Sequence, residues 1–155
     1  MNKSIIIIII FLYSLLSCGK IEKQTILAID LTSNKITIKD KVVILKKIKY
    51  SANSIIKEMN NKDKVRLIII NNSFRKFPVL IMNNENKDVV YRRINSIELF
   101  GKYNNSKIIS FLEDEYLSIK KLTNSYVNVI MISNNLPKAK IGESDKLVFY
   151  LNFQK

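Results

Sequence analysis

Apolar residues follow two patterns along the chain, and these patterns predict strands that alternate with helices. Uninterrupted apolar runs are typical of strands buried on both faces, and apolar residues spaced by three and four are typical of amphipathic helices. The predicted strands are Thr25–Asp30, Val65–Ile70, Phe77–Met82, Val127–Ile132 and Leu147–Phe153. The predicted helices are Val42 to about Asn60, Val89–Phe100 and Lys107–Leu122.

The order of these elements predicts a small doubly wound α/β fold, with a mostly parallel sheet and helices on both faces. Parallel neighbours need a crossover of a dozen or more residues, which the predicted helices provide. Pro78 favours the edge of the sheet for Phe77–Met82, because a proline has no N–H to donate. The short loop Asn71–Lys76 makes that edge strand the antiparallel partner of Val65–Ile70.

Ligands of such folds bind beyond the carboxyl ends of the strands, near the point where the strand order reverses. Polar residues follow three of the predicted strands at this place. The candidate ligand or partner face consists of Asp30, Thr32, Asn34, Asn71, Asn72, Ser133 and Asn134.

The amino-terminal segment has the pattern of an export signal. Lys3 precedes an apolar run from Ile5 to Leu16, which is too short for a transmembrane helix of about 20 residues. The residues that follow, Leu15-Leu16-Ser17-Cys18, resemble the lipobox of bacterial lipoproteins. The alternative is an ordinary secretory signal that ends near a cysteine.

The lipobox resemblance implies cleavage before Cys18 and attachment of a diacylglyceryl group and an acyl chain, such as palmitate, to that cysteine. We therefore expect a signal peptide over residues 1–17, a lipidated tether over 18–24 and one α/β domain over 25–155. Two or more lipid chains are enough for stable anchoring. The expected location is the exported side of the inner membrane or the outer membrane. Cys18 is the sole cysteine, which excludes an intramolecular disulfide.

The element order and three short motifs resemble a von Willebrand factor A domain. Asp30-Leu31-Thr32-Ser33-Asn34 stands where that family has DxSxS, Asp63-Lys64-Val65 stands at its D-[RK]-V-like turn, and Ser133-Asn134-Asn135 stands where it has TDG. The resemblance covers about residues 24 to 153. It implies that Asp30, Thr32 and Asn34, with Asn134 in place of the last aspartate, occupy the positions of a divalent-cation site.

Only one carboxylate of that cation site is present, so the set could hold Mg²⁺ or Mn²⁺ weakly at best. The alternative role of Asp30 is to accept hydrogen bonds from the backbone of the following loop. The asparagines at 71, 72 and 134 have an alternative role as turn formers that tolerate a left-handed backbone. No other cofactor is expected.

Composition argues against an enzyme. Histidine is absent, which removes the commonest general base, and the three glycines form neither GxxxxGK[ST] nor GxGxxG. The carboxylate run Glu113-Asp114-Glu115 is predicted to be a solvated helix face, as are Lys46-Lys47 and Lys120-Lys121. Without residues 1–17, 26 − 1 = 25 basic and 13 acidic side chains remain, so the net charge is near +12.

The leading hypothesis is a membrane-anchored, non-catalytic binding module of the bacterial cell envelope. Its partner is expected to be an envelope or extracellular protein that contacts the strand-end face, and nucleic acid is not an expected partner. The first alternative is a basic-surface binder of anionic lipid, nucleic acid or glycan, because a large positive charge attracts polyanions through a salt-screened field. The second alternative is a structural subunit of a membrane complex.

Overall fold

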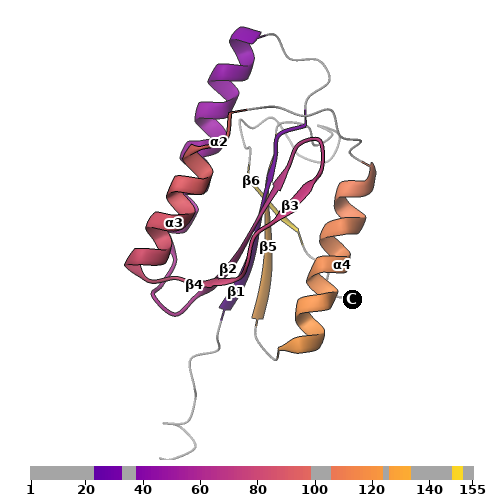
Figure 1. The fold of residues 1–155 in the computed structure, drawn as a ribbon. Helices are drawn as coiled ribbons and strands as arrows, with labels where there is room; N and C mark the ends of the chain where they lie inside the picture. Colours follow the sequence, from indigo (N-terminus) through magenta and orange to yellow (C-terminus); the bar gives the residue numbers. More distant parts are fainter. Residues whose placement is uncertain (1–22, 33–37, 99–105, 124–125, 134–147, 152–155) are drawn as a thin grey trace, which may run out of the picture.

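The computed structural model describes residues 23–32, 38–98, 106–123, 126–133 and 148–151, which form a mixed β-sheet flanked by three helices (Figure 1). The strands are β1 Lys23–Asp30, β2 Lys64–Ile70, β3 Phe74–Lys76, β4 Leu80–Ile81, β5 Tyr126–Ser133 and β6 Val148–Leu151. The helices are α2 Ile38–Glu58, α3 Asn84–Asn95 and α4 Ser106–Leu122. The α/β class predicted from the sequence is confirmed.

The parallel part of the sheet lies at its centre. The strand order is β3-β2-β1-β5-β6, and β4 also pairs with β2. Strand β1 runs parallel to both β2 and β5, whereas β3, β4 and β6 are antiparallel to their neighbours. The register sets Asp30 beside Ile70 on one side and beside Ser133 on the other. The carboxyl ends of the three parallel strands therefore meet at one end of the sheet.

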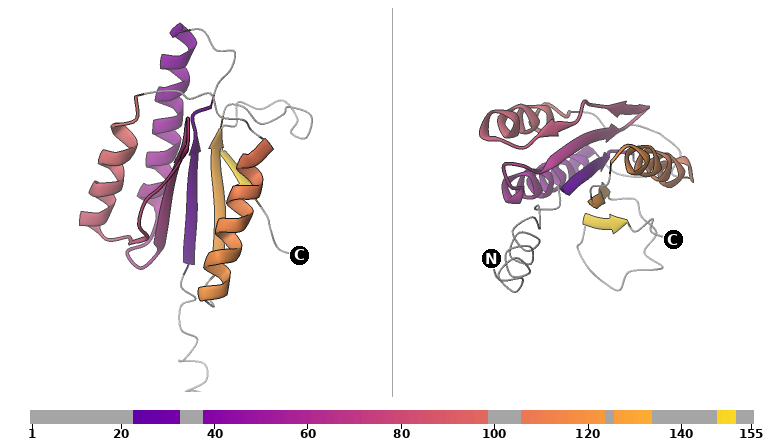
Figure 2. Two further views of the ribbon diagram at one scale, coloured as in Figure 1. Left: turned by 45° about the vertical axis from the view of Figure 1, so that its right-hand side comes forward. Right: turned by 90° about the horizontal axis from the view of Figure 1, so that it is seen from below.

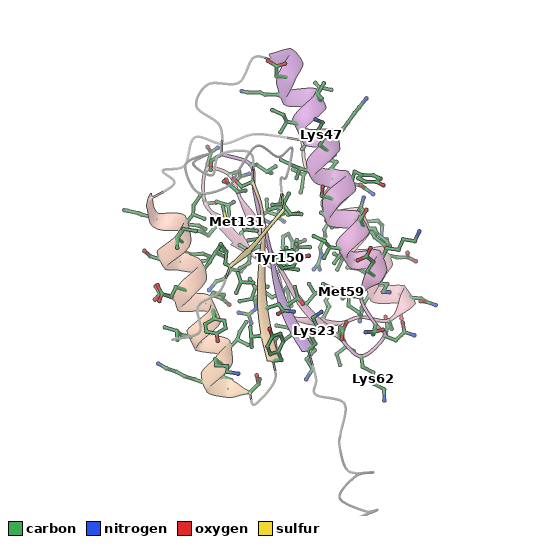
Figure 3. The ribbon with its side chains drawn as sticks, turned by 180° about the vertical axis from the view of Figure 1, so that it is seen from behind. Lys23, Lys47, Met59, Lys62, Met131 and Tyr150 are labelled. Atoms are coloured by element: carbon green, nitrogen blue, oxygen red, sulfur yellow. The ribbon has the colours of Figure 1, made fainter. Side chains whose placement is uncertain are left out.

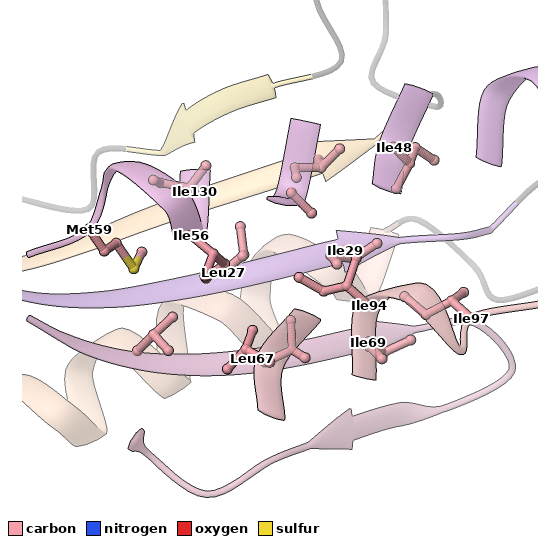
Figure 4. Packing of buried hydrophobic residues seen from close by; sticks show 14 of the residues in the cluster. Leu27, Ile29, Ile48, Ile56, Met59, Leu67, Ile69, Ile94, Ile97 and Ile130 are labelled. Atoms are coloured by element: carbon pink, nitrogen blue, oxygen red, sulfur yellow. The ribbon is translucent and has the colours of Figure 1, made fainter. Parts of the chain in front are cut away.

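Strand β1 is buried on both faces, as its uninterrupted apolar run predicts. Alternate residues of a strand point to opposite faces, so Leu27 and Ile29 pack with α2 and α3 while Ile26 and Ala28 pack with α4. Figure 2 shows α2 and α3 on one side of the sheet and α4 on the other. The larger cluster of buried residues lies on the α2 and α3 side (Figure 4).

Helices α2 and α3 are held together by polar contacts as well as by the core. The Nζ of Lys49 donates to the carbonyl oxygen of Asn95 at 2.6 Å, and the amide of Asn53 donates to the side chain of Asn95 at 3.1 Å. Lys87 of α3 donates to the carbonyl oxygen of Met59 at 2.5 Å. This lysine partners a carbonyl group just past the end of α2, where the helix leaves its last carbonyls without helical partners.

Four of the predicted elements are confirmed with end shifts of a few residues. They are the strands β1, β2 and β5 and the helix α4. The helix predicted from Val42 begins earlier, at Ile38, and ends at Glu58.

The strand predicted over Phe77–Met82 is wrong in position, because it is two short strands, β3 and β4. The side chain of Asn71 accepts the backbone N–H of Asn72 at 2.7 Å, and this tight turn lets antiparallel pairing begin at Phe74. Phe77 still donates its N–H to Leu67, but Pro78 has none to donate, and pairing resumes only at β4.

Two other predictions need correction. The helix predicted over Val89–Phe100 spans Asn84–Asn95, because Asn83 caps it by accepting the N–H of Asn86 at 2.7 Å. The first turn of this helix is polar, so the apolar periodicity of the sequence does not extend to it. The last strand, β6, pairs antiparallel with β5, so both edges of the sheet are antiparallel where one was predicted. Among the described residues, no helix is long and apolar enough to cross a membrane.

Candidate functional site

The carboxyl ends of β1 and β5 form the point where the strand order reverses. From β1 the chain proceeds to β2 on one side, and it later returns to β5 on the other side of β1. In open α/β sheets this is the usual place for a ligand. Asp30 ends β1 and Ser133 ends β5, and the two residues are direct neighbours in the parallel register.

Asp30 is the centre of a buried hydrogen-bond cluster at this point. Its Oδ1 accepts the backbone N–H of Thr32 at 2.8 Å and the hydroxyl of Thr32 at 2.6 Å. Its Oδ2 accepts the hydroxyl of Ser133 at 2.5 Å. Asp30 is 1% exposed, and Thr32 and Ser133 are also buried. The cluster therefore ties the end of β1 to the end of β5 and to the chain that follows β1.

The alternative role that the sequence left open for Asp30, acceptance of hydrogen bonds from the following loop, is confirmed by the Thr32 N–H contact. The three residues Asp30, Thr32 and Ser133 are brought together as the strand-end prediction required. Asn34 and Asn134, which were predicted to belong to the same face, lie outside the described residues, as does Cys18.

Asn71 and Asn72 follow β2 at the same end of the sheet. The Oδ1 of Asn71 accepts the N–H groups of Asn72 at 2.7 Å and Ser73 at 3.4 Å, so this side chain stabilises its own turn. No described non-glycine residue has a positive φ, so a left-handed backbone is not the reason for these asparagines. Asn72 is exposed at this end of the sheet and is a candidate for contact with a partner.

The structure describes Asp30 and Thr32 of the predicted Mg²⁺ or Mn²⁺ site, whereas Asn34 and Asn134 lie outside the described residues. A hard cation prefers oxygen ligands with one or two carboxylates, but here both oxygens of the buried carboxylate already accept hydrogen bonds. Among the described residues, no group of three or more His, Cys, Asp or Glu side chains could hold a metal ion. The Asp30 cluster is better suited to hold the strand ends in place.

The first turns of α2 carry exposed apolar side chains at this end of the described structure. Helix α2 runs past the end of β1 (Figure 1), and Val42 and Val43 on it are 54% and 51% exposed. Lys46 and Lys47 follow one turn later and are exposed as well. We name these four residues the α2 tip. An exposed valine pair beside lysines is a surface that a protein partner can cover.

One polar cluster was missed by the sequence reasoning. Glu115 was predicted to be on a solvated face, but its side chain is 6% exposed and forms ion pairs with Arg66 of β2 and with Lys76 of β3, the latter at 3.1 Å. The signal was available, because Glu115 comes three residues after Leu112 and four before Ile119, on the apolar stripe of α4. Phe111 stacks on Phe74 at 3.8 Å beside it, so α4 is fastened to the β2–β3 hairpin.

Comparison with known proteins finds no family model that matches the sequence and no matching curated protein. The structure itself defines an α/β protein. It has one mixed sheet, helices on both faces of that sheet and a buried polar cluster where the strand order reverses.

Proposed function

We propose that this protein is a bacterial lipoprotein, anchored through Cys18, whose α/β domain binds another envelope or extracellular protein without catalysis. The observation that supports this proposal most is that a buried carboxylate and an exposed apolar surface lie at the same end of the sheet. The potential acid or base there, Asp30, is buried with both oxygens in hydrogen bonds, and the exposed α2 tip lies at the same end. A buried, satisfied carboxylate stabilises the fold, and exposed apolar side chains favour binding.

We also propose that the domain is a degenerate von Willebrand A-like domain. In support, β1 is central, β2 lies beside it, and the antiparallel β3 lies beyond β2. Asp30, Thr32 and Ser133, which occupy motif positions of that family, come together at the strand ends. The antiparallel β6 departs from the mostly parallel sheet that the resemblance implies.

The anchoring part of the proposal rests on the sequence Leu15-Leu16-Ser17-Cys18. Its test is the mass of the mature amino terminus after expression of the full chain in a bacterium. A thioether-linked diacylglyceryl group on Cys18 is the expected result. An unmodified amino terminus would contradict the anchor and leave the binding domain to be tested by itself.

The binding part is tested with a photo-crosslinking residue at Val43 in the full chain, in cells. A discrete crosslinked partner is expected at this position, and its yield should fall in the double variant Val42→Ser with Lys46→Glu. The matched control is Tyr150, which is 76% exposed on the edge strand β6, away from the α2 tip (Figure 3). The same partner captured with equal yield from both positions would contradict a strand-end binding face.

The salt dependence of binding distinguishes the proposed protein-binding face from the alternative, a basic-surface binder of polyanions. Binding to nucleic acid or another polyanion falls steeply as the salt concentration rises, because counterions compete for the charged sites. Contact through Val42 and Val43 depends much less on salt, because burial of apolar surface is not a charge effect.

A further inference from the structure

The end of the domain opposite the α2 tip carries lysines and exposed apolar side chains together. The three parallel strands begin here, and Lys23 of β1 is the direct register neighbour of Tyr126 of β5. Leu122 ends α4 shortly before β5 begins, and Lys62 lies between α2 and β2. Figure 3 shows Lys23 and Lys62 at this end, far from Lys47. We name Lys23, Lys62, Lys121, Leu122 and Tyr126 the amino-end surface.

Leu122 is the most unusual residue of this surface. Leu122 continues the apolar stripe of α4, but it is 81% exposed, because α4 ends at the end of the sheet where the parallel strands begin. Tyr126 is 50% exposed at the first position of β5, and Lys121 is exposed in the last turn of α4. Exposed leucine and tyrosine with lysines as neighbours are typical of protein surfaces that lie in the interface of an anionic membrane.

Among the described residues at this end, the acidic side chains lie on the flank formed by α2, α3 and the start of β2, next to Lys62. Glu58 ends α2, Glu85 lies in the first turn of α3, and Asp63 accepts the backbone N–H of Asn60 at 2.9 Å. The side of the end formed by α4, β5 and β1 has Lys23 and Lys121 next to Leu122 and Tyr126. Anionic headgroups would meet this side first.

Composition alone does not distinguish this surface from the α2 tip, which also has lysines beside apolar residues. The tether distinguishes them. Cys18 and Lys23 are five peptide links apart, so the chain between them spans at most roughly 17 Å. Strand β1, with eight residues, is about 25 Å long. A tether shorter than the strand cannot turn the domain over to place the α2 tip on the membrane.

We propose that the amino-end surface rests on the anionic headgroups of the membrane that holds the anchor, with Leu122 and Tyr126 at the interface and the lysines on lipid phosphates. This proposal rests on the lipid anchor at Cys18 of the proposed function. It deepens that function, because the α2 tip and the Asp30 cluster then point away from the bilayer. A partner can reach the strand-end face without contact with lipid.

The test is lysine footprinting of the full chain, expressed in a bacterium and inserted into vesicles of phosphatidylcholine or of phosphatidylcholine with phosphatidylglycerol. An amine-acetylating reagent that does not cross membranes is applied, and modification of each lysine is measured by mass spectrometry. On anionic vesicles at low salt, we expect acetylation of Lys62 and Lys121 to fall about fivefold. This factor corresponds to the roughly 1 kcal/mol that one lysine gains near an anionic membrane surface. Lys46 and Lys47 should react equally in both vesicles, and high salt should remove the protection.

Matched charge variants complete the test. Lys62→Glu with Lys121→Glu should abolish the headgroup-dependent protection of Lys23, whereas Lys46→Glu with Lys47→Glu changes the charge equally and should leave it intact. Protection of Lys46 and Lys47, or equal reactivity of Lys62 in both vesicles, would overturn the docking proposal. The mass at Cys18 is read in the same spectra. An unmodified Cys18 with protected Lys62 and Lys121 contradicts the anchor but supports docking, and an unmodified Cys18 without protection contradicts both.

Discussion

Replacement of Glu115 by glutamine tests whether the buried ion-pair cluster holds α4 on the sheet. The substitution keeps the size of the side chain and removes its charge. Glu115 is 6% exposed, and Arg66 and Lys76 are 27% and 51% exposed, so the two partners differ in how well water screens them. The pair with Arg66 is therefore the stronger one.

The magnitude follows from these exposures. A buried charge-assisted hydrogen bond contributes about 1.5–3 kcal/mol, and the half-exposed Lys76 pair contributes at most about 1 kcal/mol. Glu115→Gln should lower the free energy of unfolding by about 2–4 kcal/mol, because it also leaves Arg66 without its charged partner. For a chain of this size, that is a fall in Tm of roughly 10 °C.

The assay is urea unfolding followed by circular dichroism on the full chain in detergent, with Asp114→Asn as the matched control. Asp114 is exposed on the same helix and loses the same charge, so its effect should stay within about 0.5 kcal/mol. A double-mutant cycle with Arg66→Met should give a coupling of about 1.5–3 kcal/mol, and one with Lys76→Met should give less. Equal loss in the Glu115 and Asp114 variants would refute the reasoning.

Three further predictions follow from the described contacts. Asp30→Ala leaves the donors of Thr32 and Ser133 without their acceptor and should destabilise the fold by about 2–4 kcal/mol in the same assay, whereas Asp30→Asn should cost less. Calorimetric titration with millimolar Mg²⁺ or Mn²⁺ should give no binding heat, and a saturable signal lost in Asp30→Asn would contradict the hydrogen-bond role. Leu67→Ala should destabilise by about 2–5 kcal/mol, because Leu67 is 1% exposed in the larger cluster, while Val42→Ser should stay within about 0.5 kcal/mol.

The central elements could be predicted because their residues carry a local signal. An apolar run such as Ile26–Ile29 can be buried only between two layers, and the spacing of Ile108, Leu112 and Ile119 selects one face of a helix. The same logic brought Asp30 and Ser133 to one end of the sheet, because parallel strands share the direction of their carboxyl ends. Edge strands and polar first turns carry a weaker signal, which is why β3, β4 and α3 were misplaced.

By itself, the sequence determined the α/β class and the parallel strands β1, β2 and β5 at the centre of the sheet. Only the tertiary structure decided what the polar residues do. Asp30 could have faced a ligand, but the neighbouring strand supplies the hydroxyl of Ser133, and Glu115 could have faced water, but β2 and β3 place two cations beneath it. Periodicity reports which face of an element is buried, whereas the partner of a polar group depends on residues that are distant in sequence and adjacent only after folding.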